Sequence, residues 1–159
     1  MRSLLIFTVL LLVPGLGTHR AALDAPLTQL PAPPQMDVKG RWKVKFNLSG
    51  VGEKNLVLES KAGGVCSFSL LDAGVESKPL QAAWSQTTND RVNFSGEAEL
   101  PLGTCCVEIG TLVFKGKFKS NDSISGKAVF IGSTQDEENL NGFRTMVGTF
   151  IATRDSANH

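Results

Sequence analysis

Few side chains in this 159-residue chain are suited to acid–base or nucleophilic chemistry. The sequence has 2 histidines, His19 near the N-terminus and His159 at the last position, and neither falls inside the segment expected to fold. Serine–histidine and cysteine–histidine catalysis both require a base beside the nucleophile. We therefore expect no catalytic residues and no enzymatic activity.

Closely spaced carboxylates occur as the pair Glu97 and Glu99 and as a run at residues 136–138. Strand alternation places the pair on an outer face, and we interpret the run as part of a solvated loop. The run lacks the spacing of a calcium loop, and two adjacent cysteines cannot readily share one tetrahedral zinc ion. Together with the absence of a glycine-rich phosphate motif from the sequence, this predicts no metal site and no cofactor.

Three cysteines, Cys66, Cys105 and Cys106, could form one disulfide if the protein is exported. Cys66 could pair with Cys105 or Cys106 across a sheet, or the two adjacent residues could form a strained and easily reduced ring. A cross-strand bridge or three reduced thiols are the favoured alternatives. A redox role is disfavoured because no basic neighbour or CxxC spacing would lower a thiol pKa.

The N-terminus has the pattern of a secretory signal peptide. Met1 and Arg2 precede an apolar run at residues 4–13, which is shorter than a bilayer-spanning helix. We expect a signal peptide at residues 1–17, cut as late as residue 25, and a proline-rich linker at residues 18–36. This pattern predicts a secreted or periplasmic protein with no stable membrane insertion after cleavage.

The remaining chain alternates apolar and polar residues with the period of a β-strand. In GRWKVKFNL, residues 40–48, Trp42, Val44, Phe46 and Leu48 share one face. About eight such segments follow one another, separated by short turns rich in Gly, Asn and Asp. Because closure would bury every apolar face and remove exposed edges, we predict an all-β, antiparallel meander barrel at residues 37–155, with a tail at residues 156–159.

Gly40 and Trp42 at the start of the first strand, with Arg154 at the end of the last, resemble the signature of the calycin superfamily, which includes lipocalins, fatty-acid-binding proteins and avidins. The resemblance implies that Trp42 packs across one end of the barrel and that Arg154 lies over its ring, a cation–π contact. It also implies the binding of a small ligand inside the barrel.

The predicted interior is lined by aromatic side chains, which we take as candidate ligand-binding residues: Phe46, Phe68, Trp84, Phe94, Phe114, Phe118, Phe130 and Phe150. Such a lining would hold a small, mostly apolar ligand by excluding water. Alternatively, these side chains could fill a solid barrel whose loops, at residues 100–104 and 132–142, contact another exported protein or a polymer. The net charge is +1, and the basic residues are scattered among acidic ones along the sequence. This gives no reason to expect nucleic acid or an anionic surface as a partner.

Overall fold

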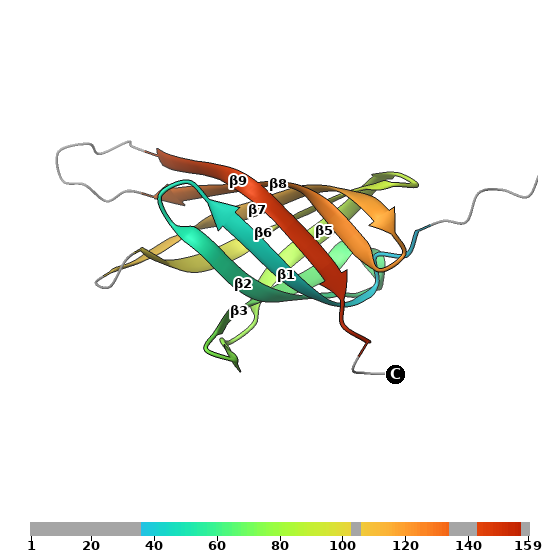
Figure 1. The fold of residues 1–159 in the computed structure, drawn as a ribbon, viewed down its shortest axis with the longest axis horizontal. Helices are drawn as coiled ribbons and strands as arrows, with labels where there is room; N and C mark the ends of the chain where they lie inside the picture. The colour runs from blue at the N-terminus through green and yellow to red at the C-terminus, as the bar shows by residue number, and fades with distance from the viewer. Residues whose placement is uncertain (1–35, 103–105, 134–142, 157–159) are drawn as a thin grey trace, which may run out of the picture. The chain divides into compact units, whose positions relative to one another are not determined.

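The computed structural model describes residues 36–102, 106–133 and 143–156. It contains nine strands and one short 3₁₀ turn, η1 (Ala62–Gly64) (Figure 1). The strands are β1 (Gly40–Leu48), β2 (Gly52–Ser60), β3 (Val65–Asp72), β4 (Val75–Glu76), β5 (Leu80–Thr88), β6 (Arg91–Leu102), β7 (Cys106–Ser120), β8 (Ser123–Ser133) and β9 (Phe143–Arg154). No helix in these residues is long and apolar enough to cross a membrane.

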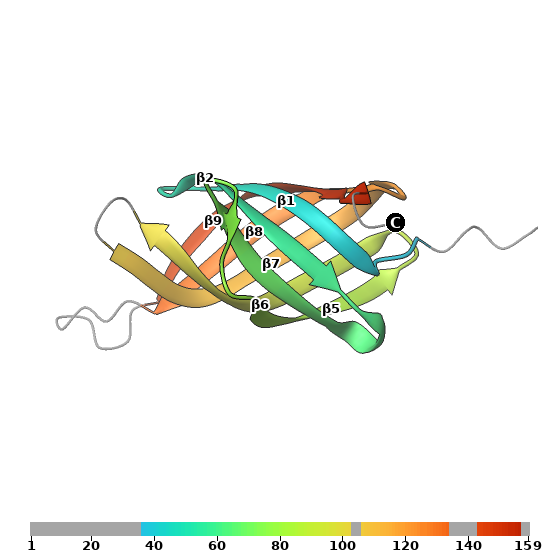
Figure 2. The same cartoon turned by 90° about the horizontal axis from the view of Figure 1, so that it is seen from below.

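Eight of the strands form a closed antiparallel barrel. Each pairs with its neighbours in the order β1, β2, β3, β5, β6, β7, β8, β9, and β9 pairs with β1 from Trp42↔Arg154 to Leu48↔Gly148. Figures 1 and 2 show the strands winding around a common axis. The short strand β4 pairs only with β3 and lies outside the ring. The predicted fold class, an all-β meander barrel of eight strands, is confirmed.

The alternating pattern of each strand accounts for the core. Residues predicted to face inward on β1 are all buried, and the same parity holds on the strands that follow. Trp42, Phe114 and Phe130 each have 0% of their surface exposed. Since successive side chains of a strand point to opposite faces, this parity places one hydrophobic cluster on the barrel axis.

The strands run further than the turn residues predict. Leu100 was predicted both as the last inward-facing residue of its strand and as the first residue of a loop at residues 100–104. It is fully buried in β6 and pairs with Glu108 of β7. Burial of its side chain and continuation of the backbone ladder extend the strand to Leu102, so this loop prediction was wrong at its start. The other predicted loop begins inside β8, since Gly132 and Ser133 are its last two residues.

Several predictions lie wholly or partly outside the described residues. They concern the signal peptide, the linker up to residue 35, residues 103–105 and residues 134–142. They stay predictions. The short strand β4, which the sequence did not predict, follows a tight turn at Ala73 and Gly74, both with positive φ.

Candidate functional site

One end of the barrel is closed by Trp42. Its indole is fully buried and its Nε1 donates a hydrogen bond to the carbonyl oxygen of Val38 at 2.9 Å. The Arg154 guanidinium carbon lies 4.3 Å from the centre of the indole ring. The predicted contact between Trp42 and Arg154 is therefore confirmed, and the two residues are also direct partners in the β1–β9 ladder.

Arg154 also ties the chain entering the barrel to this end. Its Nη1 donates to the carbonyl oxygen of Lys39 at 2.7 Å, and its Nη2 donates to that of Asp37 at 2.7 Å. Gly40, the residue after Lys39, has φ +120, and a Cβ there would come 3.0 Å from Arg154 Nη1. The positive φ favours glycine at this position. Gly40, Trp42 and Arg154 thus lie together where the first and last strands pair.

The predicted interior aromatics pack largely against one another. The Phe114 ring lies with its centre 5.6 Å from that of Phe46, 5.8 Å from that of Phe68 and 4.7 Å from that of Phe150. These tilted and edge-on arrangements are the ones that aromatic pairs prefer. Phe94, Phe118 and Phe130 are buried in the same cluster, and Trp84 packs half-buried against it. The middle of the barrel is therefore occupied by its own side chains.

A pocket of about 300 Å³ opens through the barrel wall where strand lengths do not match. β5 begins at Leu80 and pairs with β3 only as far as Phe68, whereas β6 continues to Leu102. No ring strand in the described residues therefore separates Leu70 of β3 from Ala98 of β6. The residues that line the pocket are Leu56, Phe68, Leu70, Ser77, Lys78, Leu80, Glu97, Ala98 and Glu99.

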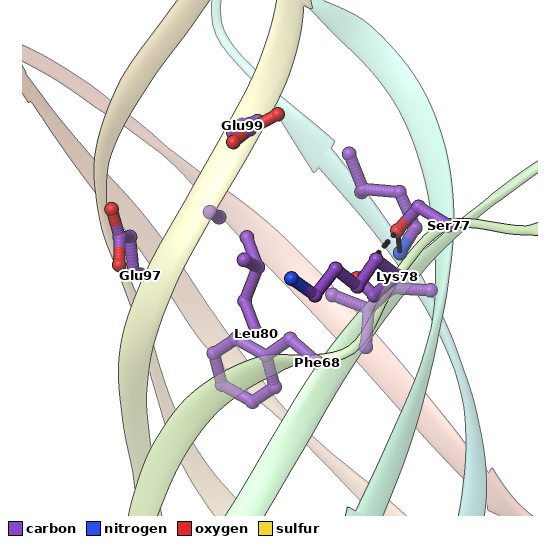
Figure 3. A pocket seen from close by; sticks show the side chains of 9 residues that line it. Phe68, Ser77, Lys78, Leu80, Glu97 and Glu99 are labelled. Carbon is purple, nitrogen blue, oxygen red and sulfur yellow. Dashed lines mark hydrogen bonds between the residues drawn. The ribbon is translucent and has the colours of Figure 1, made fainter.

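The pocket has an apolar floor and a charged rim, as Figure 3 shows. Phe68 and Leu80 lie at the floor, and the amine of Lys78 extends over it on the side facing Glu97 and Glu99. Lys78, Glu97 and Glu99 are all exposed. The glutamates face outward as predicted, but the gap left by β5 turns this outer position into the edge of a cavity.

The side of the rim that carries Lys78 is fixed to the barrel by hydrogen bonds and an ion pair. The backbone N–H of Ser77 donates to the carbonyl oxygen of Leu70 at 2.8 Å, and the Leu70 N–H donates to Ser77 Oγ at 2.9 Å. The neighbouring Glu76 of β4 pairs with Arg41 on the outer wall of β1. These contacts hold the segment after β4 beside the pocket, so the pocket is preformed.

Sequence reasoning identified one lining residue of this pocket, Phe68, as a ligand-binding candidate and missed the others. Leu56, Leu70, Leu80 and Ala98 were assigned to inward faces without a binding role, and Lys78 was taken as the first residue of a strand. A signal was present in the sequence: Pro79 cannot donate a ladder hydrogen bond, so it marks a place where strand pairing stops.

Of the two favoured alternatives for Cys66, a cross-strand disulfide or a reduced thiol, the structure has the reduced thiol. Cys66 carries a free thiol, 3% exposed, and the ladder puts it level with Ala82, Gly96 and Leu112 on the following strands. Cys106 lies six residues before Leu112 along β7, which corresponds to about 20 Å of strand. A disulfide needs Cα atoms within about 7 Å, so these two cysteines cannot meet. Cys105 lies outside the described residues.

Burial raises the pKa of the Cys66 thiol to about 12 from a usual value of 9.0. In a variant with Cys105→Ser and Cys106→Ser, we expect Cys66 to resist iodoacetamide at pH 8 because the reactive thiolate is scarce and shielded. Unfolding in denaturant should restore rapid labelling. Mass spectrometry would measure both rates, and equal labelling of the folded and unfolded protein would contradict the buried position.

The same shift predicts the direction of a pH effect on stability. Between about pH 9 and 12 the unfolded chain loses the Cys66 proton while the folded protein keeps it. Stability therefore falls as pH rises through this window, and a Cys66→Ser variant should lose this contribution. Denaturant titrations of both proteins at pH 8 and pH 10.5 would measure it, and an equal decline in both would contradict it.

Within the described residues, no group of three or more His, Cys, Asp and Glu side chains lies together in a way that could hold a metal ion.

Comparisons with protein-family models, with curated proteins and with solved structures found no match. The candidate function therefore rests on the geometry of the barrel and its pocket.

Proposed function

We propose that this chain is an exported, calycin-like barrel that binds a small, mostly apolar ligand in the wall pocket between β3, β5 and β6. The observation that carries the proposal is the apolar floor of Leu56, Phe68 and Leu80, which reaches the barrel interior through a preformed opening. Water in such a pocket gains little hydrogen bonding, so its displacement by apolar surface favours binding.

The size and rim of the pocket define the ligand class. A volume of about 300 Å³ is at the small end of ligand pockets, so the ligand is a compact molecule rather than a long lipid chain. Lys78 offers a positive charge and Glu97 and Glu99 offer negative charge at the rim. A polar end of either sign can therefore stay hydrated at the opening while the apolar body is buried.

Membership of the calycin superfamily is supported by the arrangement at the closed end. Gly40, Trp42 and Arg154 occupy the positions in the first and last strands that the resemblance implies. Export is supported by the signal-peptide pattern of the sequence alone. Because Trp42 occupies one end of the barrel, we propose that the ligand enters through the opening in the wall.

Binding of the neutral dye Nile red tests the proposal. We expect a saturable rise in fluorescence with the wild-type protein, and an affinity at least tenfold weaker for Leu80→Trp, whose larger side chain fills part of the pocket. Val147→Trp is the matched control, because it adds the same ring at an exposed position, 57% accessible, on the outer wall. Failure of the wild type to saturate, or equal binding by Leu80→Trp, would overturn the proposal.

A second candidate function is that of an interaction module for another exported protein. It is favoured by exposed aliphatic side chains on the outer wall of β7, β8 and β9, namely Val107, Ile109, Ile131, Val147 and Ile151. Monomeric proteins rarely expose large contiguous apolar patches. Recovery of one defined protein by the wild type, and its loss with Ile131→Ser and Val147→Ser combined, would support this function over ligand binding.

A further inference from the structure

The outer wall of β6, β7 and β8 carries a hollow of about 400 Å³ with an unusual concentration of positive charge. We call it the basic hollow; it is lined by Thr87, Arg91, Asn93, Lys115, Gly116, Lys117, Ser125, Gly126 and Lys127. Four of these side chains are cationic and none is acidic. The sequence distributes them over 37 positions, from residue 91 to residue 127, among acidic residues, so the cluster is created by strand pairing.

The strand register places like charges directly opposite one another. Arg91 pairs with Lys117 across β6 and β7, and Lys115 pairs with Lys127 across β7 and β8. Like charges at directly opposed positions of a sheet destabilise it. Within the described residues Lys115 and Lys127 form no ion pair, whereas Lys117 is bonded to Asp90 at 2.9 Å. The basic hollow thus keeps about three uncompensated positive charges.

We infer that the basic hollow binds a chain of an anionic polysaccharide, bearing sulfate or carboxylate groups, on the outside of the barrel. The four cations lie in two rows on neighbouring strands, with about 5 Å between strands and about 7 Å between rows. This grid can place two or more cations around one anionic group and others along the chain. Bound anions would offset the repulsion between the opposed cations, Arg91 with Lys117 and Lys115 with Lys127.

The neutral residues of the basic hollow favour a carbohydrate over a lipid surface. Thr87, Asn93 and Ser125 supply hydroxyl and amide groups beside the cations, and these can exchange hydrogen bonds with sugar hydroxyls. The backbone of Gly116 and Gly126, which pair directly, belongs to the same recess. Together with the cations, these groups can hold one segment of a sugar chain.

This inference goes beyond both proposed functions and does not depend on the wall pocket. Binding of fluorescent dextran sulfate, measured by anisotropy at 50 mM and 150 mM NaCl, tests it on the full exported chain. We expect saturable binding that weakens with salt, and at least tenfold weaker binding for the double variant Lys115→Gln and Lys127→Gln. Uncharged dextran should not bind.

The matched control is the double variant Lys43→Gln and Lys45→Gln, which removes the same net charge. Lys43 and Lys45 lie on β1, paired with Asp155 at 3.1 Å and Glu53 at 2.8 Å. We expect this control to lose less than threefold in affinity. An equal loss in both double variants would overturn the assignment, since it would show a response to net charge alone. Absence of dextran sulfate binding at 50 mM NaCl would also overturn it.

Two further readouts separate a binding role from other roles. Removing Lys115 and Lys127 should raise the unfolding temperature slightly, since it relieves repulsion, and should leave Nile red binding unchanged.

Binding to vesicles of phosphatidylcholine with 30% phosphatidylserine tests whether the basic hollow recognises an anionic membrane instead. Tighter binding to these vesicles than to dextran sulfate, lost in the same variant, would assign the basic hollow to an anionic membrane and overturn the polysaccharide inference.

Discussion

Replacing Trp42 with alanine is expected to lower the free energy of unfolding by about 3–5 kcal/mol, as large-to-small changes of buried aromatics do. The indole is fully buried, contacts the Phe118 ring at 6.2 Å between centres and bonds Val38, so its loss leaves a cavity that the barrel end cannot refill. Thermal unfolding followed by circular dichroism should show a fall in Tm of roughly 10–20 °C.

The matched control is Trp84→Ala. Trp84 is half-buried and donates its Nε1 hydrogen bond to the Lys61 carbonyl oxygen at 2.8 Å near the surface, so its removal should be less destabilising. Arg154→Ala should also be milder than Trp42→Ala, because the indole stays in place. If Trp42→Ala left unfolding unchanged, Trp42 would not be closing the barrel.

Replacing Gly148 with alanine is expected to destabilise the barrel by about 3 kcal/mol or more, at the upper end of overpacking changes. A Cβ at this position would overlap the carbonyl oxygen of Asn47 and lie 2.7 Å from its carbonyl carbon and 3.0 Å from Leu48 Cα. These atoms belong to the backbone of β1, so no side-chain rotation relieves the overlap. The strands that close the barrel would have to separate.

Thr149→Ser is the control for this change. Thr149 is the next residue on β9 and is exposed, so this substitution should shift stability by about 0.5 kcal/mol or less. Urea titrations of the wild type and both variants would measure the differences. Equal stability of Gly148→Ala and the wild type would contradict the close pairing of β1 with β9, and with it the closed barrel.

Much of the fold could be predicted because the relevant signal is local. The side chains of a strand alternate between faces, so Val92, Phe94 and Ala98 could be assigned to the interior from their spacing alone. The contact between Trp42 and Arg154 was instead implied by the calycin resemblance, and the inward parity of Arg154 agrees with it. Strand ends were predicted less well, because burial of Leu100 extends a ladder that turn residues alone would stop.

The candidate site could be predicted only in part. The parity of Phe68 and Leu80 was correct, but the pocket they line exists because β5 is shorter than β6, which depends on pairing between distant segments. The interior aromatics were correctly placed, yet their mutual contacts fill most of the space that the sequence suggested for a ligand. Packing of this kind is decided by three-dimensional fit and leaves no trace in periodicity.

The sequence by itself determined an all-β chain whose apolar faces must turn toward one axis, with Trp42 at one end of it. The tertiary structure alone decided that Cys66 lies too far from Cys106 for a disulfide, that Glu97 and Glu99 border a cavity, and that Lys115 faces Lys127. The physical reason is that alternation belongs to one segment of backbone. Register and strand length instead come from hydrogen bonds and packing between segments that are far apart in the chain.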